Sequence, residues 1–386
     1  MSSPMLYFVA RQNLDEGFWR SEIQSVLRLF GCFHEISQED AEHFPFIRVH
    51  CTREQAIQAG KRSIMVKRVL EVFASGSTLS ELLVGFEAMQ QRPSMPNPSV
   101  LGPKKHSFPY QDLLQATQHL PKSQSEDARL YVLNQGEGKH WAVAAKNLAE
   151  GCYDLVTKYN LKTRNYLGPT SLTSELSFLM ANLALVQPSS FVLDPYFGTG
   201  GALIAALHFK ANVFGLDIDW RMLKEGIAFA TFDQYGLPRP DVIRGDFSKA
   251  GRPFREGVKL DAIIADPPYG IRAGARKTGE NGTKIKPEFL DSHIPQMQRY
   301  ESAEVIQDLL DAAFDMLKLG GRIVYLFPVE TAVWRAQAHE SLPKREGLRL
   351  LYAGHDQLRL GMSRILVTME RVELHQEESK KQRLVA

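Results

Sequence analysis

The chain has 386 residues, which is enough for two or three domains and at least one large core. Its 44% hydrophobic and 23% charged residues are typical of a soluble globular protein. The 46 Lys and Arg residues nearly balance the 44 Asp and Glu residues, so net charge neither indicates nor excludes a nucleic-acid partner, and an RNA site has to come from local clusters.

The three cysteines, Cys32, Cys51 and Cys152, are widely spaced and suit a reducing compartment. They form no metal-binding pair, and we predict no metal site. No apolar run approaches the length of a membrane span, and the N-terminus lacks a signal-peptide pattern. We therefore expect no membrane association and a cytosolic or nuclear protein, which we assign to the cytoplasm.

The first 160 residues predict an α+β module. Residues 5–10 are typical of a strand, and residues 18–30 carry apolar side chains at the spacing of an amphipathic helix that ends at Gly31. Residues 46–50 predict another strand, and a second helix follows from Ala56. This region holds no pattern typical of a catalytic site, so we interpret it as a recognition or scaffold module.

Three further features of this region are predicted from the sequence. Four basic residues could face RNA phosphates, although a solvated helix face is the commoner explanation: Lys61, Arg62, Lys67 and Arg68. Residues 91–109 are rich in proline and predict a loop or an edge connection. Residues 129–133 and 140–145 predict a β-hairpin.

The second half of the chain predicts a doubly wound α/β domain. After a polar connector (159–169), a helix is expected over 173–186, and strands and helices then alternate. The expected strands are 191–193, 212–218, 241–244, 260–265 and 322–327, and the expected helices are 202–209, 220–235 and 304–317, the last capped by Gly320 and Gly321. Residues 348–353 and 364–370 predict a terminal hairpin, and we expect the polar tail 375–386 to be disordered.

The stretch from Asp194 to Gly201 (DPYFGTGG) predicts a strand, a tight glycine turn and a helix start. Such a turn directs backbone N–H groups and the positive end of a helix dipole at a small polar ligand. A side chain at Gly198 or Gly200 would block the approach of that ligand. Leu203 stands where the dinucleotide-binding fingerprint has its third glycine, which makes a nicotinamide enzyme remote.

Two more signals follow the next expected strands. Asp217 ends one of them, where a carboxylate can hold ribose hydroxyls, whereas a helix cap is the alternative for Asp217 and the better explanation for Asp219. Asp246 and Phe247 follow the third strand, where a carboxylate and an aromatic ring could bracket an adenine. The second of these signals is weak by itself.

The most specific signal is Asp266-Pro267-Pro268-Tyr269-Gly270, directly after an apolar strand. Two prolines stiffen the backbone and remove N–H donors, which leaves carbonyl acceptors. Asp266 adds another acceptor and Tyr269 a flat ring. This combination suits a planar base with an NH2 group, and the alternative is a proline turn with a surface tyrosine.

The strand ends DPYFGTGG, GLDID, GDF and DPPYG resemble amino-methyltransferases that use S-adenosylmethionine. Residues 158–172, 175–182 and 271–279 narrow the resemblance to the catalytic subunit of eukaryotic tRNA guanosine-10 N2-methyltransferases. The similarity covers most of residues 155–372 and is looser in the N-terminal half. It implies a Rossmann-like class I methyltransferase domain with a mostly parallel sheet and a terminal antiparallel hairpin over 161–374, after a ferredoxin-like segment and a THUMP RNA-binding region over 1–160.

The resemblance also implies site residues. The cofactor's methionine end would lie at Asp194, Gly198, Thr199 and Gly200, with Thr173 and Glu175 near its carboxylate and amino group; Asp217 would hold the ribose, and Asp246 with Phe247 the adenine. The pair Tyr196-Phe197 departs from the family's pattern, and we expect it to alter packing only. A heterodimer with a small zinc-binding activator protein is implied as well.

The expected mechanism is positioning. Asp266 and the Pro267 carbonyl would accept the two N2 hydrogens of a flipped guanine, Asp266 would take the proton, and Tyr269 would stack on the base. Arg272, Arg276 and Lys277 would contact phosphates beside it, and the N-terminal module would dock on tRNA. The rival functions are another amino-methyltransferase, acting on DNA or RNA adenine or cytosine or on protein glutamine, and a catalytically silent RNA-binding subunit.

Overall fold

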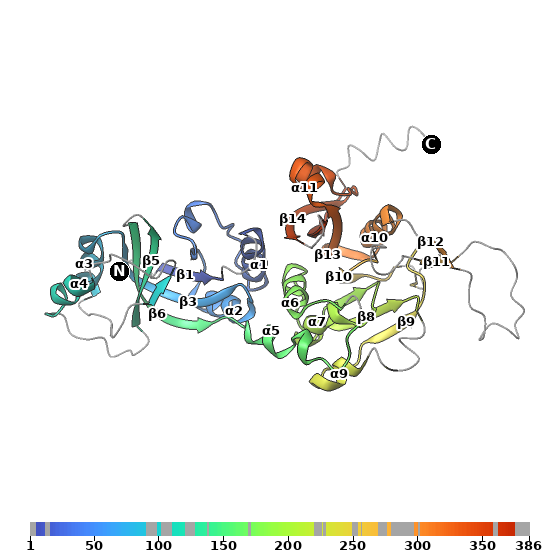
Figure 1. Cartoon of the computed structure of the whole chain (residues 1–386), viewed down its shortest axis with the longest axis horizontal. Helices are drawn as coiled ribbons and strands as arrows, with labels where there is room; N and C mark the ends of the chain where they lie inside the picture. The colour runs from blue at the N-terminus through green and yellow to red at the C-terminus, as the bar shows by residue number, and fades with distance from the viewer. Residues whose placement is uncertain are drawn as a thin grey trace, which may run out of the picture. The chain divides into compact units, whose positions relative to one another are not determined.

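The structure is a computed structural model, and all structural statements refer to the residues that it describes: 5–11, 16–89, 99–101, 110–119, 128–136, 139–168, 171–219, 226, 229–248, 254–255, 257–268, 276–278, 297–299, 302–357 and 362–374. The chain forms two compact units, Met1–Tyr153 and Asp154–Ala386, which we call the N-terminal and C-terminal units (Figure 1). From sequence we had drawn this division between residues 160 and 161. In the described part of the chain, no helix is both long and apolar enough to cross a bilayer.

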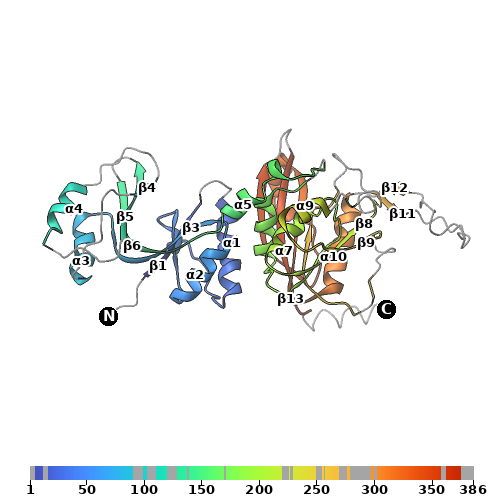
Figure 2. The same ribbon diagram turned by 90° about the horizontal axis from the view of Figure 1, so that it is seen from below.

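The N-terminal unit is built on a six-stranded sheet with the order β2-β1-β3-β6-β5-β4, in which only the β4–β5 pair is parallel. Figure 2 shows α1 and α2 at one end of this unit and α3 and α4 at the other. The strands are β1 Met5–Ala10, β2 Phe46–Val49, β3 Val66–Gly76, β4 Ser99–Leu101, β5 Ala128–Gly136 and β6 Lys139–Glu150. The helices are α1 Glu16–Leu29, α2 Arg53–Arg62, α3 Leu79–Met89 and α4 Tyr110–Ala116.

Local sequence explains where these elements begin and end. Thr52 and Gln55 form a reciprocal capping box at the start of α2. Gly31, with φ 78°, follows the end of α1, as the sequence predicted. The fully buried Glu22 of α1 accepts hydrogen bonds from Ser63 Oγ (2.5 Å) and Ile64 N (3.0 Å), which ties α1 to the chain after α2. The predicted β5–β6 hairpin is confirmed, whereas most of the proline-rich segment 91–109 lies outside the described residues.

The C-terminal unit contains a seven-stranded sheet with the order β14-β15-β13-β10-β7-β8-β9. All strands from β13 to β9 run parallel, and β15 and β14 are antiparallel to their neighbours, so the predicted parallel sheet with a terminal hairpin is confirmed. The strands are β7 Phe191–Asp194, β8 Asn212–Asp217, β9 Asp241–Arg244, β10 Leu260–Ala265, β13 Leu317–Glu330, β14 Leu348–Gln357 and β15 Met362–Arg371. A separate ladder joins β11 Arg276–Thr278 to β12 Met297–Arg299.

Helices cover both faces of this sheet, because its central strands are apolar on both sides. Figure 1 shows α6 and α7 on one side of the strands and α10 on the other. Leu309 of α10 belongs to one core cluster with Leu193, Ile263 and Ile323. The helices are α5 Asp154–Lys158, α6 Ser174–Leu183, α7 Ile204–His208, α9 Ala230–Tyr235, α10 Ser302–Met316 and α11 Thr331–Gln337, with single 3-10 turns at Leu161–Thr163, Gly201–Leu203 and Ala338–Ser341.

Two of the helices expected from sequence differ in the structure or lie partly outside the described residues. The expected helix over 220–235 is described only as α9, and most of the rest lies outside the described residues. The prediction that Gly320 and Gly321 cap the helix before them was wrong, since the helix ends at Met316 and both glycines lie within β13. They are needed there because Gly320 has φ 77° and a Cβ on Gly321 would lie 3.0 Å from the Asp261 carbonyl oxygen.

A buried ion pair fixes the hairpin strand β15 to the parallel part of the sheet. Arg322 Nε of β13 donates to Glu370 Oε2 of β15 at 3.3 Å, and both residues are 4% exposed. Arg322 also donates to the Leu183 carbonyl of α6 at 2.8 Å, and Arg349 of β14 donates to Glu370 at 2.8 Å. One guanidinium therefore joins the sheet, the hairpin and α6.

We predict that Glu370→Ala destabilises the C-terminal unit by about 3–5 kcal/mol, because it leaves the Arg322 guanidinium buried without its carboxylate. For a unit of this size the loss corresponds to a fall of roughly 10 °C in the unfolding midpoint by calorimetry. The matched control is Asp233→Ala, which breaks the solvent-exposed Asp233–Arg239 pair (2.7 Å) and should leave the midpoint unchanged. Equal midpoints for the two variants would contradict the role of the buried pair.

Candidate active site

Three predicted carboxylates lie at one edge of the parallel sheet. Asp194 ends β7, Asp217 ends β8 and Asp266 directly follows β10. The order β10-β7-β8 makes these strands neighbours, and chain order reverses on either side of β7. Such a reversal opens a crevice beyond the carboxyl ends of the strands, which is where open α/β sheets bind their ligands.

Asp194 is the most perturbed of these groups. Its side chain is 2% exposed, and Oδ1 accepts one hydrogen bond from Tyr196 N at 2.9 Å. Burial raises the pKa of Asp194 to about 8; the Tyr196 hydrogen bond opposes the rise, and the negative charges of Asp266 and Asp217 add to it. The carboxyl is therefore mostly protonated at pH 7, and a cation in the crevice would favour its ionised form.

Asp217 joins the end of β8 to the glycine turn. Its Oδ2 accepts from Gly198 N at 2.6 Å and its Oδ1 from Asp219 N at 2.7 Å. Burial raises the pKa of Asp217, and the hydrogen bonds from Asp219, Gly198 and Ile218 oppose the rise. The side chain thus joins the strand end to the glycine turn and lines the same edge as Asp194. The alternative of a helix cap stays a prediction, because residues 220–225 lie outside the described residues.

The glycine turn departs from the predicted arrangement of free N–H groups. Gly198 N–H donates to Asp217 and Gly200 N–H donates to the Phe197 carbonyl at 2.6 Å, so neither is directed at a ligand. The helix that follows begins with a 3-10 turn, and α7 has only 5 residues, which weakens any dipole contribution. The expectation that the turn directs backbone N–H groups at a ligand is thus not met by Gly198 and Gly200, and the assignment of these glycines to a ligand site stays a prediction.

Gly200 of the turn and Gly215 of β8 are required for packing. Gly200 has φ 71°, and a Cβ there would lie 2.5 Å from Phe232 Cζ and 2.8 Å from Phe197 Cε2. A Cβ on Gly215 of β8 would lie 2.5 Å from Phe197 Cδ2. Phe197 is 2% exposed and stacks on Phe232 with ring centroids 6.3 Å apart. The turn is thus held against β8 by an inserted aromatic ring, for which both glycines make room.

The segment before α6 lies against this turn. Gly168 N donates to Ser171 Oγ at 2.8 Å, and that hydroxyl is 3.4 Å from Thr199 Oγ1. A Cβ on Gly201 would lie 3.2 Å from Leu172 N. Ser171 was not singled out from sequence; only its place within the resemblance segment 158–172 could have pointed to it.

Thr173 and Glu175 stand at the start of α6. Thr173 is its N-cap and accepts from Leu176 N at 3.3 Å, and Glu175 is a half-buried residue of the first turn. Their position beside the glycine turn follows from the contact between Leu172 and Gly201. The capping bond gives the Thr173 hydroxyl a structural role, which does not depend on any ligand.

Asp246 and Phe247 follow β9 and are both buried. Asp246 is 9% exposed and accepts from Ser248 N at 2.8 Å. Phe247 is 3% exposed, belongs to the core beside α10, and meets the Tyr196 ring edge to face at 5.9 Å. Tyr196 OH in turn donates to the Val305 carbonyl at 3.5 Å. The aromatic rings that distinguish Tyr196-Phe197 from the family pattern are thus both engaged in packing.

The proline corner begins where β10 ends. Asp266 is half-buried, Pro267 is buried, and Pro268 is half-buried. Tyr269 and Arg272, which were predicted to contact the base and the phosphates, lie outside the described residues. Of the predicted catalytic residues, Asp266 and Pro267 are therefore described, and they lie at the same edge of the sheet as Asp194 and Asp217.

The predicted RNA-contacting cations that the structure describes lie on two elements, β11 and the end of α2. Arg276 and Lys277 lie on β11, opposite Arg299 and Gln298 of β12. Lys61 and Arg62 close α2 of the N-terminal unit, where Lys61 is exposed. Burial lowers the pKa of Arg62 to about 9, which marks it as a packed side chain rather than an open phosphate contact.

Comparison with known proteins identifies similar families and relatives independently of the geometry. Residues 162–346 match a family described as RMKL-like, methyltransferase domain. The chain is 33% identical to a protein from Homo sapiens named tRNA (guanine(10)-N(2))-methyltransferase TRMT11, over 95% of this chain and 88% of the relative. It is 31% identical to the Dictyostelium discoideum protein of the same name, over 91% and 79%. The crystal structure of TrmN from Thermus thermophilus aligns with 96% of this chain and 100% of its own, at 18% identity and a TM-score of 0.45.

The packing role of Gly200 predicts the outcome of Gly200→Ala. A left-handed φ costs a residue with a side chain about 1–2 kcal/mol, and the overlap with Phe232 and Phe197 adds about 1–3 kcal/mol. Gly236→Ala is the matched control, because Gly236 has φ 63° with nothing within 4 Å of its added Cβ. Denaturant unfolding should show a larger loss for Gly200→Ala; equal losses would exclude the aromatic overlap as a constraint.

Proposed function

Because the chain belongs to the tRNA (guanine(10)-N(2))-methyltransferase family, we propose that it transfers a methyl group from S-adenosylmethionine to the exocyclic N2 of guanosine 10 in tRNA. The observation that carries this proposal is the Asp266-Pro267 corner beside the buried Asp194 and the half-buried Asp217 at the switch point of the sheet. Asp266 and the Pro267 carbonyl are hydrogen-bond acceptors that suit an amino group. Asp194 and Asp217 beside them are acidic groups that suit a cation.

The electrostatics of the crevice fit the proposed cofactor. Asp194 and Asp217 both have raised pKa values, because loss of solvent around the buried Asp194 and the half-buried Asp217 disfavours the charged form, and no cation is among the causes of either shift. A ligand with a sulfonium and an ammonium group would offset this acidic excess. When bound, S-adenosylmethionine supplies an activated methyl group. We assign Asp194, with Gly198, Thr199 and Gly200, to its methionine end and Asp217 to its ribose.

The adenine and carboxylate ends of the cofactor are assigned to two further pairs of residues. Asp246 and Phe247 would hold the adenine, with Phe247 as a fixed wall because its ring is packed on Tyr196. Thr173 and Glu175 would lie near the methionine carboxylate and amino group. Backbone groups of α6 would supply the Thr173 contribution, because the hydroxyl already caps the helix.

The main contribution of the protein's own residues to the reaction is to orient the guanine amine. Guanine N2 is a weak nucleophile because its lone pair is delocalised into the ring. Acceptance of its two hydrogens by Asp266 and the Pro267 carbonyl directs that lone pair out of the ring plane, and Asp266 takes the proton that the alkylated nitrogen releases. Tyr269 would stack on the base. A rigid proline pair keeps the carbonyl in place during the reaction.

Two partners complete the proposal. The N-terminal unit, as a ferredoxin-like segment with a THUMP region, would dock on tRNA with Lys61 as a candidate phosphate contact. In the C-terminal unit, Arg272, Arg276 and Lys277 would contact phosphates beside the target base. A small zinc-binding activator would add a strand to the catalytic sheet at one of its edge strands. Ile243 of β9 is 42% exposed and Leu351 of β14 is 37% exposed, so each edge offers apolar surface. The complex would act in the cytoplasm.

The rival functions are less well supported. An adenine, cytosine or glutamine methylase can share the acidic proline corner, but the relatives that match nearly the whole chain carry the tRNA guanine name. A catalytically silent RNA-binding subunit would not need three acidic groups gathered at the switch point.

We predict that cofactor binding at pH 7 releases close to one proton. The pKa of Asp194 in the free protein is about 8, above the usual carboxyl value of about 3.9, so the group is protonated at pH 7 in roughly nine molecules of ten. A bound cation lowers this pKa and expels the proton. Calorimetry of S-adenosylmethionine binding in buffers of different ionisation heat measures the release. Asp194→Asn should abolish it, and a wild-type binding enthalpy independent of buffer would contradict the assignment.

We predict that Asp266→Ala lowers turnover by about 10²–10⁴-fold while tRNA and cofactor binding stay within a few-fold. Asp266→Asn should be intermediate, because the amide oxygen still accepts a hydrogen bond but cannot take a proton. Asp261→Asn is the control: Asp261 lies on the same strand, β10, at the opposite edge of the sheet, where it bonds Phe191 N and Lys318. Single-turnover methylation measures all three, and near-normal turnover of Asp266→Ala would refute the assigned role.

A further inference from the structure

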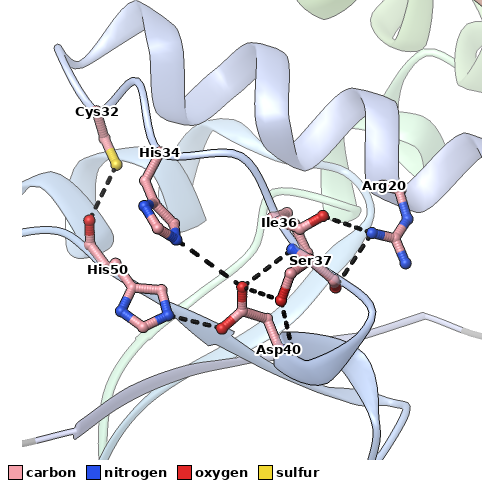
Figure 3. A network of polar contacts seen from close by, with 7 residues as sticks. All are labelled: Arg20, Cys32, His34, Ile36, Ser37, Asp40 and His50. Carbon is pink, nitrogen blue, oxygen red and sulfur yellow. Dashed lines mark hydrogen bonds and ion pairs between the residues drawn. The ribbon is translucent and has the colours of Figure 1, made fainter.

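Two histidines and an aspartate meet in the N-terminal unit, outside the proposed catalytic site (Figure 3). His34 lies in the segment after α1, Asp40 in the 3-10 turn Glu39–Ala41, and His50 directly after β2. His50 Nε2 is 2.6 Å from Asp40 Oδ1, and His34 Nε2 is 3.9 Å from Asp40 Oδ2. The ligand atoms of all three lie within 4.8 Å of one another, and the two imidazole centroids are 4.3 Å apart.

These separations are close to those of a transition-metal site. Metal–ligand bonds of about 2.0–2.1 Å in a tetrahedral site put neighbouring ligand atoms about 3.3 Å apart, which lies between the two distances to Asp40. Both imidazoles turn Nε2 toward the Asp40 carboxylate, His50 to Oδ1 and His34 to Oδ2. Small rotations of the histidine side chains would bring the donors to the required separation.

The carboxylate is already held by neighbours that are not ligands. Ser37 donates to Asp40 Oδ2 twice, from N at 3.0 Å and from Oγ at 2.8 Å, which leaves Oδ1 directed at His50. Asp40 N donates in return to Ser37 Oγ at 3.0 Å. Arg20 of α1 bonds the carbonyls of Ile36 and Ser37, which fixes the segment that carries this serine. Such outer contacts typically orient metal ligands.

The exposure of the three side chains shows what kind of site this is. Asp40 is 7% exposed, whereas His34 is 52% and His50 is 38% exposed. The anionic donor is therefore fixed and the two neutral donors are reachable from solvent. Cys32 Sγ donates to the His50 carbonyl at 3.4 Å and is not part of the cluster. Three protein donors leave one tetrahedral position for water.

We propose that His34 Nε2, His50 Nε2 and Asp40 Oδ1 bind one divalent transition-metal ion, Zn²⁺, with water as the fourth ligand. Zn²⁺ suits two imidazoles and a carboxylate, which are borderline and hard donors. The ion would replace the His50–Asp40 hydrogen bond and link the segment after α1 to the end of β2. The sequence offered no signal for this site, since the three residues follow no familiar ligand spacing and come together only through the fold.

The test is a Zn²⁺ titration of the full-length chain against a chromophoric chelator, with and without the double substitution His34→Ala/His50→Ala. Wild type should bind one Zn²⁺ more per chain than the double variant, or bind it about 100-fold or more tightly. Co²⁺ in place of Zn²⁺ should give the intense visible absorption of four-coordinate cobalt in wild type only. Where the chain is purified with a zinc-binding partner, the partner's zinc is common to all variants and cancels in the difference.

His119→Ala is the matched control, because His119 is an exposed histidine of the same unit outside the cluster; it should retain wild-type stoichiometry. Both substituted histidines are partly exposed, so the double variant is expected to fold, and circular dichroism checks this. Thermal unfolding gives a second readout: Zn²⁺ should raise the midpoint of wild type and of His119→Ala but not of the double variant. Equal Zn²⁺ stoichiometry and affinity in wild type and double variant would overturn the proposal.

Discussion

The accumulation of negative charge at one edge of the C-terminal sheet is the constraint on which the rest depends. Parallel pairing of β10, β7 and β8 brings Asp266, Asp194 and Asp217 to the same edge, and the buried position of Asp194 gives its carboxyl a pKa of about 8. Like charges in a poorly solvated place are unfavourable unless a proton or a cation offsets them. The fold therefore gathers acidic groups at the strand ends where open α/β sheets bind their ligands, and a cationic ligand there would offset their charge.

Aromatic packing keeps this edge in shape. Phe197 fills the space that Gly200 and Gly215 leave, and Asp217 closes the same turn by accepting from Gly198 N. At the far side of the sheet, the buried Arg322–Glu370 pair fixes the hairpin that completes it. The crevice is thus supported by rigid strands and short turns, which suits a reaction whose main requirement is the orientation of a weak nucleophile.

Strong local sequence patterns made the architecture predictable. The hydrogen-bond partners of individual atoms could not be predicted in this way. Apolar runs such as 260–265 and the helical spacing of apolar residues before Gly31 indicated strands and helices, and the strand-end aspartates indicated the site. The use of the Gly198 and Gly200 N–H groups within the turn could not be read from sequence, because it depends on Asp217 and on the Phe197 ring. The placement of Gly320 inside β13 depends likewise on pairing with β10. The cluster of His34, Asp40 and His50 arises from three segments that only tertiary structure joins.

The most direct test of the central claim uses the acceptor atom itself. Two otherwise identical tRNA transcripts, one with guanosine and one with inosine at position 10, are incubated with the protein, the proposed zinc-binding activator and methyl-labelled S-adenosylmethionine. Their nucleosides are then analysed by mass spectrometry. Inosine lacks only the exocyclic amine, so N2-methylguanosine should form in the first tRNA, and the second should remain unlabelled. Equal labelling of both tRNAs, or label on any atom other than N2, would contradict the assignment of the Asp266–Pro267 corner to that amine.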